Sequence, residues 1–249
     1  MDAIILFILI QKRKRRRISI NKNRINTKKF VILHAQMITK IYTDNPNPKE
    51  VRRVADLLRE GGIVVLPTDT LYAFACSMEF KRSVETIAQL KGFSLKKAKY
   101  SMLCSSLSMA SEYVRPMDKE LFSLLRSCLP GPYTFIMDAN SNVPRNYLNP
   151  NKTIGVRVPA NTILQAVVEA IGCPLIGTSV RRVDEEIETE YLTDPELIHE
   201  TWGHRVNLVV DGGIGEDEPS TVLNCAGGEI EIMRRGKSTP EGDRLLIDL

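Results

Sequence analysis

Helix-like and strand-like segments alternate along the chain between residues 47 and 233. Asn47 and Pro48 mark a helix start, because asparagine caps helix N-termini and proline suits the first helical turn, and Gly61 marks the end of that helix. The apolar residues between them recur with the 3.6-residue period of a buried helix face. The same signals predict four more helices, over 83–92, 118–129, 161–172 and 194–203. Strand-like runs separate them, at 63–66, 101–104, 133–137, 153–158, 174–176, 206–210, 222–224 and 230–233.

This alternation predicts an α/β fold in which helices pack on a twisted mixed sheet. Gly227 and Gly228 separate the last two strands, which therefore read as a hairpin. The sequence has no internal repeat, and no linker follows residue 46. We therefore expect residues 37–249 to form a single domain.

Basic residues are concentrated in residues 1–36, before the predicted domain. This segment carries ten Lys or Arg and one acidic residue, whereas residues 37–249 carry 24 basic and 29 acidic residues, a net charge of −5. Residues 3–10 are apolar but too few to cross a bilayer, and the basic run 12–17 follows them, whereas a secretory signal has its charges first. Two interpretations stay open: a disordered extension, including an over-called start site, or a basic targeting or RNA-contacting arm.

The five cysteines are widely spaced and never paired as C-x-x-C. Several lie inside apolar runs, which is typical of buried free thiols in a reducing compartment. The three histidines have no ligand spacing either. We therefore expect a cytoplasmic protein with no membrane segment, disulfide framework or metal site.

The common nucleotide-binding and hydrolase motifs are absent from the sequence. Gly236-Lys237-Ser238 ends like a P-loop, but the first glycine of that motif would fall on Glu231. No G-x-G-x-x-G follows a predicted strand, and no G-x-S-x-G occurs. What remains is a set of polar residues at the ends of predicted strands.

Ligands bind at strand ends in open α/β sheets, so these polar residues are site candidates. Residues 62–74 read GIVVLPTDTLYAF, which places Thr68, Asp69 and Thr70 between two apolar runs. The other candidates are Lys91, Thr134, Arg157, Ser179, Ser220 and Arg234. Together they supply hydroxyls and cations, which suit an anionic small molecule.

Several of these residues also have a simpler explanation. Thr68 and Thr70 can be hydroxyls that only stabilise a turn. Arg157 can be a surface charge on an edge strand, and Lys91 can simply complement a helix C-terminus.

The order of the segments resembles that of the YrdC-like family, the threonylcarbamoyl-AMP synthases. GIVVLPTDTLYAF is followed by LPGPYTFIM, TIGVRVPAN, CPLIGTS, PSTVLN and MRRG, in the family's order and approximate spacing, over roughly residues 37–238. Enzymes of this family make threonylcarbamoyl-AMP from L-threonine, bicarbonate and ATP with Mg²⁺, and they release pyrophosphate. The product modifies adenosine 37 of certain tRNAs. The resemblance implies a single α/β domain with a twisted sheet and a concave basic cavity.

The resemblance also implies roles for the candidate residues. The residues implied to bind threonine are Thr68, Thr70, Tyr72 and Arg157, and the guanidinium of Arg157 would face the threonine carboxylate. Those implied for the nucleotide are Lys91, Thr134, Ser179, Ser220 and Arg234, with Lys91 at a phosphate and Arg234 closing the cavity.

Two motifs depart from the synthase pattern. The family's K-x-R reads Lys91-Gly92-Phe93 here, and its S-x-N reads Ser179-Val180-Arg181. Phe93 replaces one cation of the family's phosphate-binding set, and Arg181 can restore positive charge from the other side of that site. This pattern resembles the YciO branch of the family.

Two hypotheses from different classes follow. The first is a slow synthase of threonylcarbamoyl-AMP, a nucleotidyltransferase that uses no protein nucleophile and acts by positioning substrates and neutralising charge. The second is a non-catalytic RNA- or ribosome-associated protein that reuses the cavity. The net charge of −5 over residues 37–249 argues against the second, whereas the basic segment 1–36 argues for it.

Overall fold

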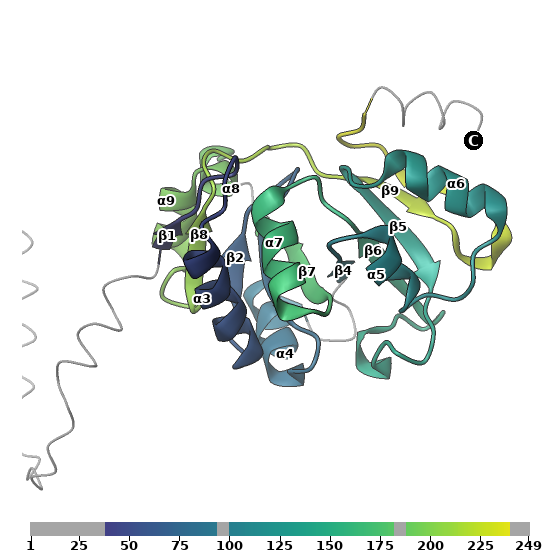
Figure 1. Ribbon diagram of the computed structural model, residues 1–249, viewed down its shortest axis with the longest axis horizontal. Helices are drawn as coiled ribbons and strands as arrows, with labels where there is room; N and C mark the ends of the chain where they lie inside the picture. The colour runs from purple at the N-terminus through teal and green to yellow at the C-terminus, as the bar shows by residue number, and fades with distance from the viewer. Residues whose placement is uncertain (1–37, 94–99, 182–187, 240–249) are drawn as a thin grey trace, which may run out of the picture. The chain divides into compact units, whose positions relative to one another are not determined.

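The structure, a computed structural model, describes residues 38–93, 100–181 and 188–239. In this part of the chain, ten strands form one mixed sheet with helices packed on both faces, which confirms the predicted single α/β domain with flanking helices (Figure 1). The strands are β1 (Ile38–Lys40), β2 (Val64–Leu66), β3 (Ala73–Ser77), β4 (Ser101–Leu103), β5 (Tyr133–Asp138), β6 (Thr153–Arg157), β7 (Leu175–Ser179), β8 (Leu208–Asp211), β9 (Thr221–Asn224) and β10 (Glu231–Arg234). Residues 1–36, for which we predict an extension, lie outside the described residues.

The sheet order is β1-β8-β2-β3-β7-β4-β6-β5-β9-β10. Four neighbouring pairs are parallel: β1 with β8, β8 with β2, β4 with β6, and β5 with β9. The other neighbours are antiparallel, including the predicted hairpin of β9 and β10. β6 therefore lies inside the sheet, between β4 and β5.

The longer helices begin and end at residues that the sequence marks. Asn47, Asp118, Asn161 and Asp194 each accept a backbone N–H with their side chain at a helix N-terminus, as expected for N-caps. Gly172 ends its helix in the left-handed conformation (φ 84°), which glycine adopts without strain. The helices are α3 (Pro48–Arg59), α4 (Lys81–Leu90), α5 (Leu107–Ser111), α6 (Lys119–Cys128), α7 (Thr162–Ile171), α8 (Glu190–Thr193) and α9 (Pro195–Trp202), with short 3₁₀ turns at Arg145–Tyr147 and Ala226–Gly228.

Three local predictions are wrong. Helix α4, expected to start at Ser83, starts at Lys81 with Phe80 at its N-cap. Ser83 lies inside the helix, and its hydroxyl donates to Gly61 O at 2.6 Å instead of capping the helix. The strand expected at 174–176 extends to Ser179, because it pairs with β3 along its whole length. Strand β3 itself was not expected, since its five residues are all buried and show no alternation of polar and apolar side chains.

The two faces of the sheet are covered differently. One face carries a core cluster that runs across nearly the whole sheet and includes side chains of α4, α6 and α9. The other face carries a smaller core beneath α3 and α7, which pack against each other, and this core extends no farther than β4. On β6, β5 and β9 the same face presents Arg157, Thr134 and Asn224, of which none belongs to a core cluster. Among the described residues no core cluster covers this half of the face, which we call the uncovered half of the sheet, and polar side chains gather there.

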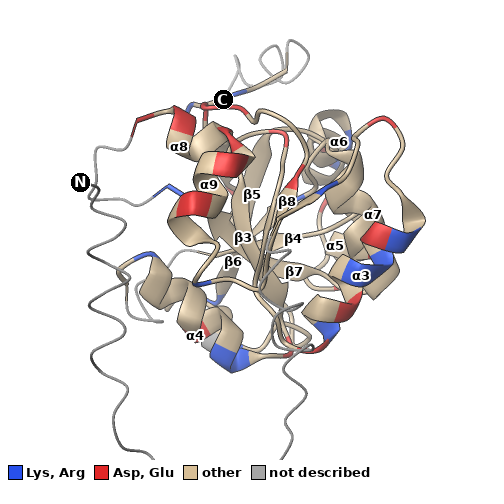
Figure 2. Cartoon of the chain, turned by 90° about the vertical axis from the view of Figure 1, so that its left-hand side faces the viewer, with Lys and Arg blue, Asp and Glu red and all other residues tan. Residues whose placement is uncertain are grey.

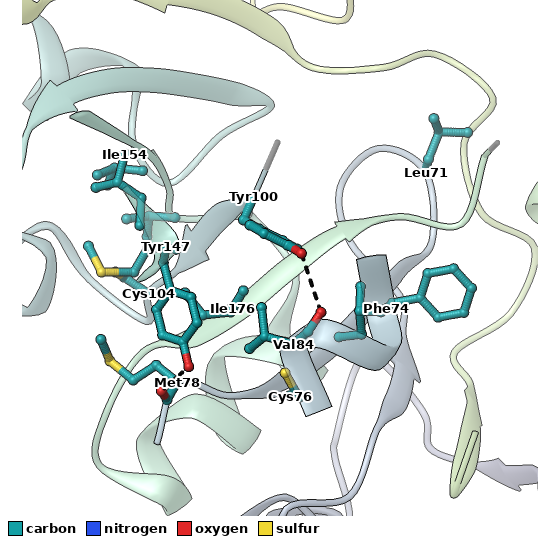
Figure 3. Close-up of a cluster of buried hydrophobic side chains, with 14 of the residues drawn as sticks. Leu71, Phe74, Cys76, Met78, Val84, Tyr100, Cys104, Tyr147, Ile154 and Ile176 are labelled. Atoms are coloured by element: carbon teal, nitrogen blue, oxygen red, sulfur yellow. Dashed lines mark hydrogen bonds between the residues drawn. The ribbon is translucent and has the colours of Figure 1, made fainter. Parts of the chain in front are cut away.

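The larger core also anchors two tyrosines by their hydroxyls (Figure 3). Tyr147 donates to Met78 O at 2.8 Å, and Tyr100 donates to Val84 O at 3.3 Å, so neither buried hydroxyl lacks a partner. Both bonds reach the region of β3 and α4, which fixes the helix that leads to Lys91. In the described part of the chain, no helix is long and apolar enough to cross a membrane.

Candidate functional site

Arg157 lies at the end of β6 and is 8% exposed. One of its terminal nitrogens donates to Asp69 Oδ1 at 2.8 Å and to Thr70 Oγ1 at 2.9 Å. Its Nε is buried and has no hydrogen-bond partner among the described residues. The interpretation of Arg157 as a surface charge on an edge strand is therefore wrong, because β6 is an interior strand and the guanidinium is enclosed.

The loop that contains Thr68, Asp69 and Thr70 is fixed by its own polar side chains. The Thr68 hydroxyl donates to Leu71 O at 2.8 Å and accepts the Thr70 N–H at 3.0 Å. The two threonine hydroxyls are 3.1 Å apart, and since that of Thr68 already donates, that of Thr70 is the donor between them. The turn-stabilising role of these hydroxyls is therefore real, and their contact with a substrate stays a prediction.

Asp69 ties this loop to the segment after β6. Its Oδ1 accepts from Arg157, and its Oδ2 accepts the Ala160 N–H at 2.8 Å. Asp69 is one of the candidate polar residues at strand ends, but no role was predicted for it. The signal that could have revealed it is the acid itself, since a carboxylate between two apolar runs requires a buried partner.

Thr134, Ser220 and Arg234 form a second polar group on the uncovered face. The Thr134 and Ser220 hydroxyls are 2.8 Å apart. Arg234 donates to Ser220 O from Nε at 3.2 Å and from a terminal nitrogen at 2.8 Å, and it lies 3.3 Å from the Ser220 hydroxyl. Parallel pairing of β5 with β9, and the β9–β10 hairpin, bring these three residues together from distant parts of the chain.

Arg234 influences Arg157 electrostatically, and Arg181 influences Arg234. Burial lowers the pKa of Arg157 from its usual value, the Asp69 carboxylate opposes this, and the charge of Arg234 lowers it further. Burial likewise lowers the pKa of Arg234, and the charge of Arg181 adds to the effect. Asp69 is the carboxylate in contact with Arg157. Guanidinium groups of this kind suit an anionic ligand, which stays a prediction for this site.

Lys91 connects the two motifs that depart from the synthase pattern. The residue is 8% exposed, and its Nζ donates to Ser179 O at 2.8 Å and to Arg181 O. Phe93, two residues farther on, is half-buried. The side chain of Lys91 thus holds the chain just after β7, and its contact with a phosphate stays a prediction.

Tyr72 is placed differently from the other residues expected to hold substrate. It is fully buried, its hydroxyl donates to Gly213 O at 2.7 Å and accepts the Gly212 N–H at 3.1 Å, and burial raises its pKa. A Cβ on Gly215 would lie 2.8 Å from the Tyr72 ring, so only glycine permits this approach. Tyr72 therefore anchors the glycine-rich loop 212–216.

Replacing Tyr72 by phenylalanine is expected to lower the free energy of unfolding by ~0.5–1.5 kcal/mol, because the Gly212 N–H and the Gly213 carbonyl lose their hydrogen bonds to the Tyr72 hydroxyl. Urea denaturation of the variant beside Tyr42→Phe, whose ring is 68% exposed, measures the difference. Equal stability of the two variants would contradict the anchoring role.

A cavity of about 420 Å³ lies between the 212–216 loop and the loop of Thr68 and Asp69. It sits where β2, β6 and β8 end, the position at which α/β sheets bind ligands. Its outer walls are joined by an ion pair of 2.9 Å between Lys237 Nζ and Glu216 Oε1.

His, Cys, Asp and Glu side chains do not gather into a metal-binding group among the described residues, and two buried cysteines hold their protons. The described residues contain no group of three His, Cys, Asp or Glu side chains that could hold a metal ion. Burial raises the pKa of Cys128 to about 11 and that of Cys225 to about 12, so these thiols stay protonated at neutral pH.

The fold is that of an α/β protein whose sheet presents Arg157 and Arg234 (the arginine cluster) beside polar side chains on one half of one face. Residues 56–236 match the Sua5/YciO/YrdC family, which is described as "telomere recombination". The chain belongs to this family.

Two relatives give the extent of the likeness. The chain is 35% identical to the uncharacterized protein YciO of Escherichia coli over 197 residues, which are 79% of this chain and 93% of that protein. The crystal structure of E. coli YciO superposes with a TM-score of 0.76 at 32% identity, covering 83% of this chain and 98% of that one. The crystal structure of Pyrococcus abyssi Sua5 complexed with L-threonine superposes with a TM-score of 0.72 at 22% identity, covering 81% of this chain and 58% of that one, which shows a shared fold.

Proposed function

We propose that this protein is a nucleotidyltransferase of the threonylcarbamoyl-AMP synthase type, slower than the synthases whose motifs it alters. Its substrates would be L-threonine, bicarbonate and ATP with Mg²⁺. The amine of threonine and bicarbonate form a carbamate, whose oxygen attacks the α-phosphate of ATP and displaces pyrophosphate. The product, threonylcarbamoyl-AMP, would serve tRNA modification.

The observation that carries this proposal is the fixed, buried Arg157, whose pKa is influenced by the charge of Arg234. Asp69 and Thr70 occupy one terminal nitrogen of Arg157, and its Nε has no partner among the described residues. A buried donor without a partner is costly, so an anionic ligand that accepts its hydrogen bond would be favoured. The family relationship supports threonine as that ligand, since P. abyssi Sua5 binds it.

The proposed chemistry requires positioning and neutralisation of charge. Arg157 would hold the threonine carboxylate, and Arg234 and Arg181 would face the phosphates. Donors fixed before the reaction stabilise developing charge without having to reorganise, and each is worth ~2–4 kcal/mol in the transition state. The loss of one cation at Phe93 therefore predicts a rate ~30- to 1000-fold below that of an intact site, with nucleotide binding retained.

The alternative, a non-catalytic RNA- or ribosome-associated protein, has less support in the described residues. Lys and Arg side chains are interspersed with acids on α3, while α8 and α9 present acidic residues such as Glu190, Glu196 and Glu200 (Figure 2). Proteins that follow an RNA backbone usually present a basic stripe.

Incubating the purified full-length protein with ATP, bicarbonate and L-threonine is the direct test. We expect release of pyrophosphate that requires both threonine and bicarbonate, together with the acyl-adenylate detected by mass spectrometry. The Arg157→Leu variant serves as a control for contaminating activity. ATP consumption that is absent, or that is equal without threonine, would contradict the proposal.

A further inference from the structure

A second cavity lies on the same face of the sheet as the arginine cluster, farther along β5. It has a volume of about 450 Å³ and is lined by residues of β5, β6, β9 and β10. Side chains two residues apart on a strand share a face, so Thr134, Ile136 and Asp138 form one row. The row starts in the arginine cluster and ends in this cavity. At ~3.3 Å per residue, about 13 Å separate the Cα atoms of its two ends.

A glycine, Gly155, lies on the sheet between the cavity and the arginine cluster. Gly155 of β6 pairs with Ile136, and a Cβ on it would lie 3.1 Å from Ser101 Oγ and 3.2 Å from Thr134 Cγ2. A side chain at this position would crowd Ser101 and Thr134, so β6 presents no side chain beside Ile136. A ligand that follows the row along β5 would have its two ends in different surroundings.

The β9–β10 hairpin contributes to both ends of this row. Its register shifts between Ile232 and Arg234, which makes Met233 the extra residue of a bulge. Met233 is 56% exposed and lines the cavity, whereas Arg234 donates to Ser220 in the arginine cluster. One short strand thus supplies an apolar side chain at one end and a cation at the other.

The chemistry of the cavity differs from that of the arginine cluster. Its described lining contains no Lys or Arg, but it contains three asparagines, a threonine and Asp138, together with apolar Ile136 and Met233. Asn149 and Thr153 are fixed to each other, through Nδ2 to Oγ1 at 2.6 Å and through N to Oδ1 at 2.9 Å. Asp138 Oδ2 accepts the Gly227 N–H at 3.2 Å, which leaves most of the acceptor capacity of the carboxylate for a ligand.

This lining suits a flat, neutral ring that carries N–H donors. An anion would be repelled by Asp138, whereas a nucleobase can place its faces against Met233 and Ile136 and its polar edge against amides and a carboxylate. Carboxylates accept from exocyclic amino groups, and asparagine can bond both the amino group and N7 of adenine.

We propose that this cavity binds the base of the nucleotide whose phosphates face Arg234 and Arg181, and that Asp138 selects a base with an exocyclic amino group. The inference rests on the proposed function for the presence of a nucleotide. It adds the location of the base and the residue that determines specificity for it.

Calorimetry with two nucleotides that differ in one group tests the proposal. ATP and purine riboside triphosphate, which lacks only the 6-amino group, are titrated into wild-type full-length protein, Asp138→Ala and Asp138→Asn. Asp44→Asn, an exposed aspartate outside the cavity, is the matched control. We expect wild type to bind ATP about tenfold more tightly than the analogue, because the carboxylate loses its donor. Asp138→Ala should bind both nucleotides equally, at the affinity of the analogue, and Asp138→Asn should recover part of the difference.

Several outcomes would overturn the proposal. Equal affinity of wild type for both nucleotides would overturn it without any variant. An equal loss of affinity for both nucleotides in Asp138→Ala would overturn it too, because that result indicates a structural role for Asp138. Dependence on Asp138 seen only with single-stranded RNA would assign the cavity to a base in RNA instead. Acyl-adenylate formation measured on the same samples separates the two claims. Turnover without discrimination contradicts only the base site, whereas discrimination without turnover contradicts only the synthase.

Discussion

Replacing Asp69 by alanine is expected to lower the free energy of unfolding by ~3–5 kcal/mol, because the change leaves the Arg157 guanidinium buried without a counter-charge. The two side chains are 8% and 10% exposed and meet at 2.8 Å. The variant also removes the acceptor of the Ala160 N–H. Urea denaturation followed by far-UV circular dichroism measures the loss.

Two further variants make this expectation specific. Asp56→Ala removes the ion pair of 2.8 Å with Arg59, whose side chains are 58% and 45% exposed, and should cost less than ~1 kcal/mol. Asp69→Ala combined with Arg157→Leu removes both buried charges and should recover much of the stability, since a buried ion pair replaced by apolar groups is often neutral. A loss in Asp69→Ala no larger than that in Asp56→Ala would show that the buried pair does not fix the loop.

The double variant also separates stability from function. If it folds as well as wild type and no longer binds threonine, Arg157 acts on the ligand and not only on the fold. Retained binding of threonine by the double variant would remove Arg157 from the proposed substrate site.

Helices were predictable here because their ends are marked locally. The caps at Asn47, Asn161 and Asp194, and the terminal glycine Gly172, each act within four residues of the chain, so a sequence window contains the whole signal. Strand β3 was missed because the two core clusters bury it on both faces, and burial on both faces removes the period-two pattern.

The candidate site was only partly predictable, for a related reason. The residue types at strand ends are visible in the sequence, but the pairing of Arg157 with Asp69 joins residues 88 positions apart. Lys91 likewise reaches Ser179 across 88 positions. A motif cannot show that its members bond one another as well as a ligand. The structure adds a clamp on the end of β7 to the phosphate contact that is predicted for Lys91.

This clamp gives the two altered motifs a physical connection. Lys91 Nζ bonds the carbonyls of Ser179 and Arg181, so the segment that starts K-x-R holds the segment that replaces S-x-N. Arg181 lies close enough to Arg234 to lower its pKa. The cation lost at Phe93 and the cation gained at Arg181 therefore act on one region of the site.

Restoring both synthase motifs, with Phe93→Arg and Arg181→Asn together, is expected to raise acyl-adenylate turnover by ~10-fold or more. Phe93 is half-buried after Gly92 (φ 77°), so an arginine can take its place with little loss of packing. Arg181→Asn alone should lower turnover, because it removes the cation that stands in for the missing one. Phe93→Arg alone should raise turnover less than the double change does, since its charge adds to that of Arg181.

The four proteins form a double-mutant cycle, and the coupling between the two positions is the informative quantity. If the cations compensate for each other, the two single changes will have opposite signs and a coupling energy of ~0.5–3 kcal/mol, as for residues that share one network. ATP affinity measured on each variant separates binding from chemistry. A double variant that folds, binds ATP and makes no more acyl-adenylate than wild type would place the divergence elsewhere in the site. The altered motifs would then belong to a different function of this cavity and not to a weakened synthase.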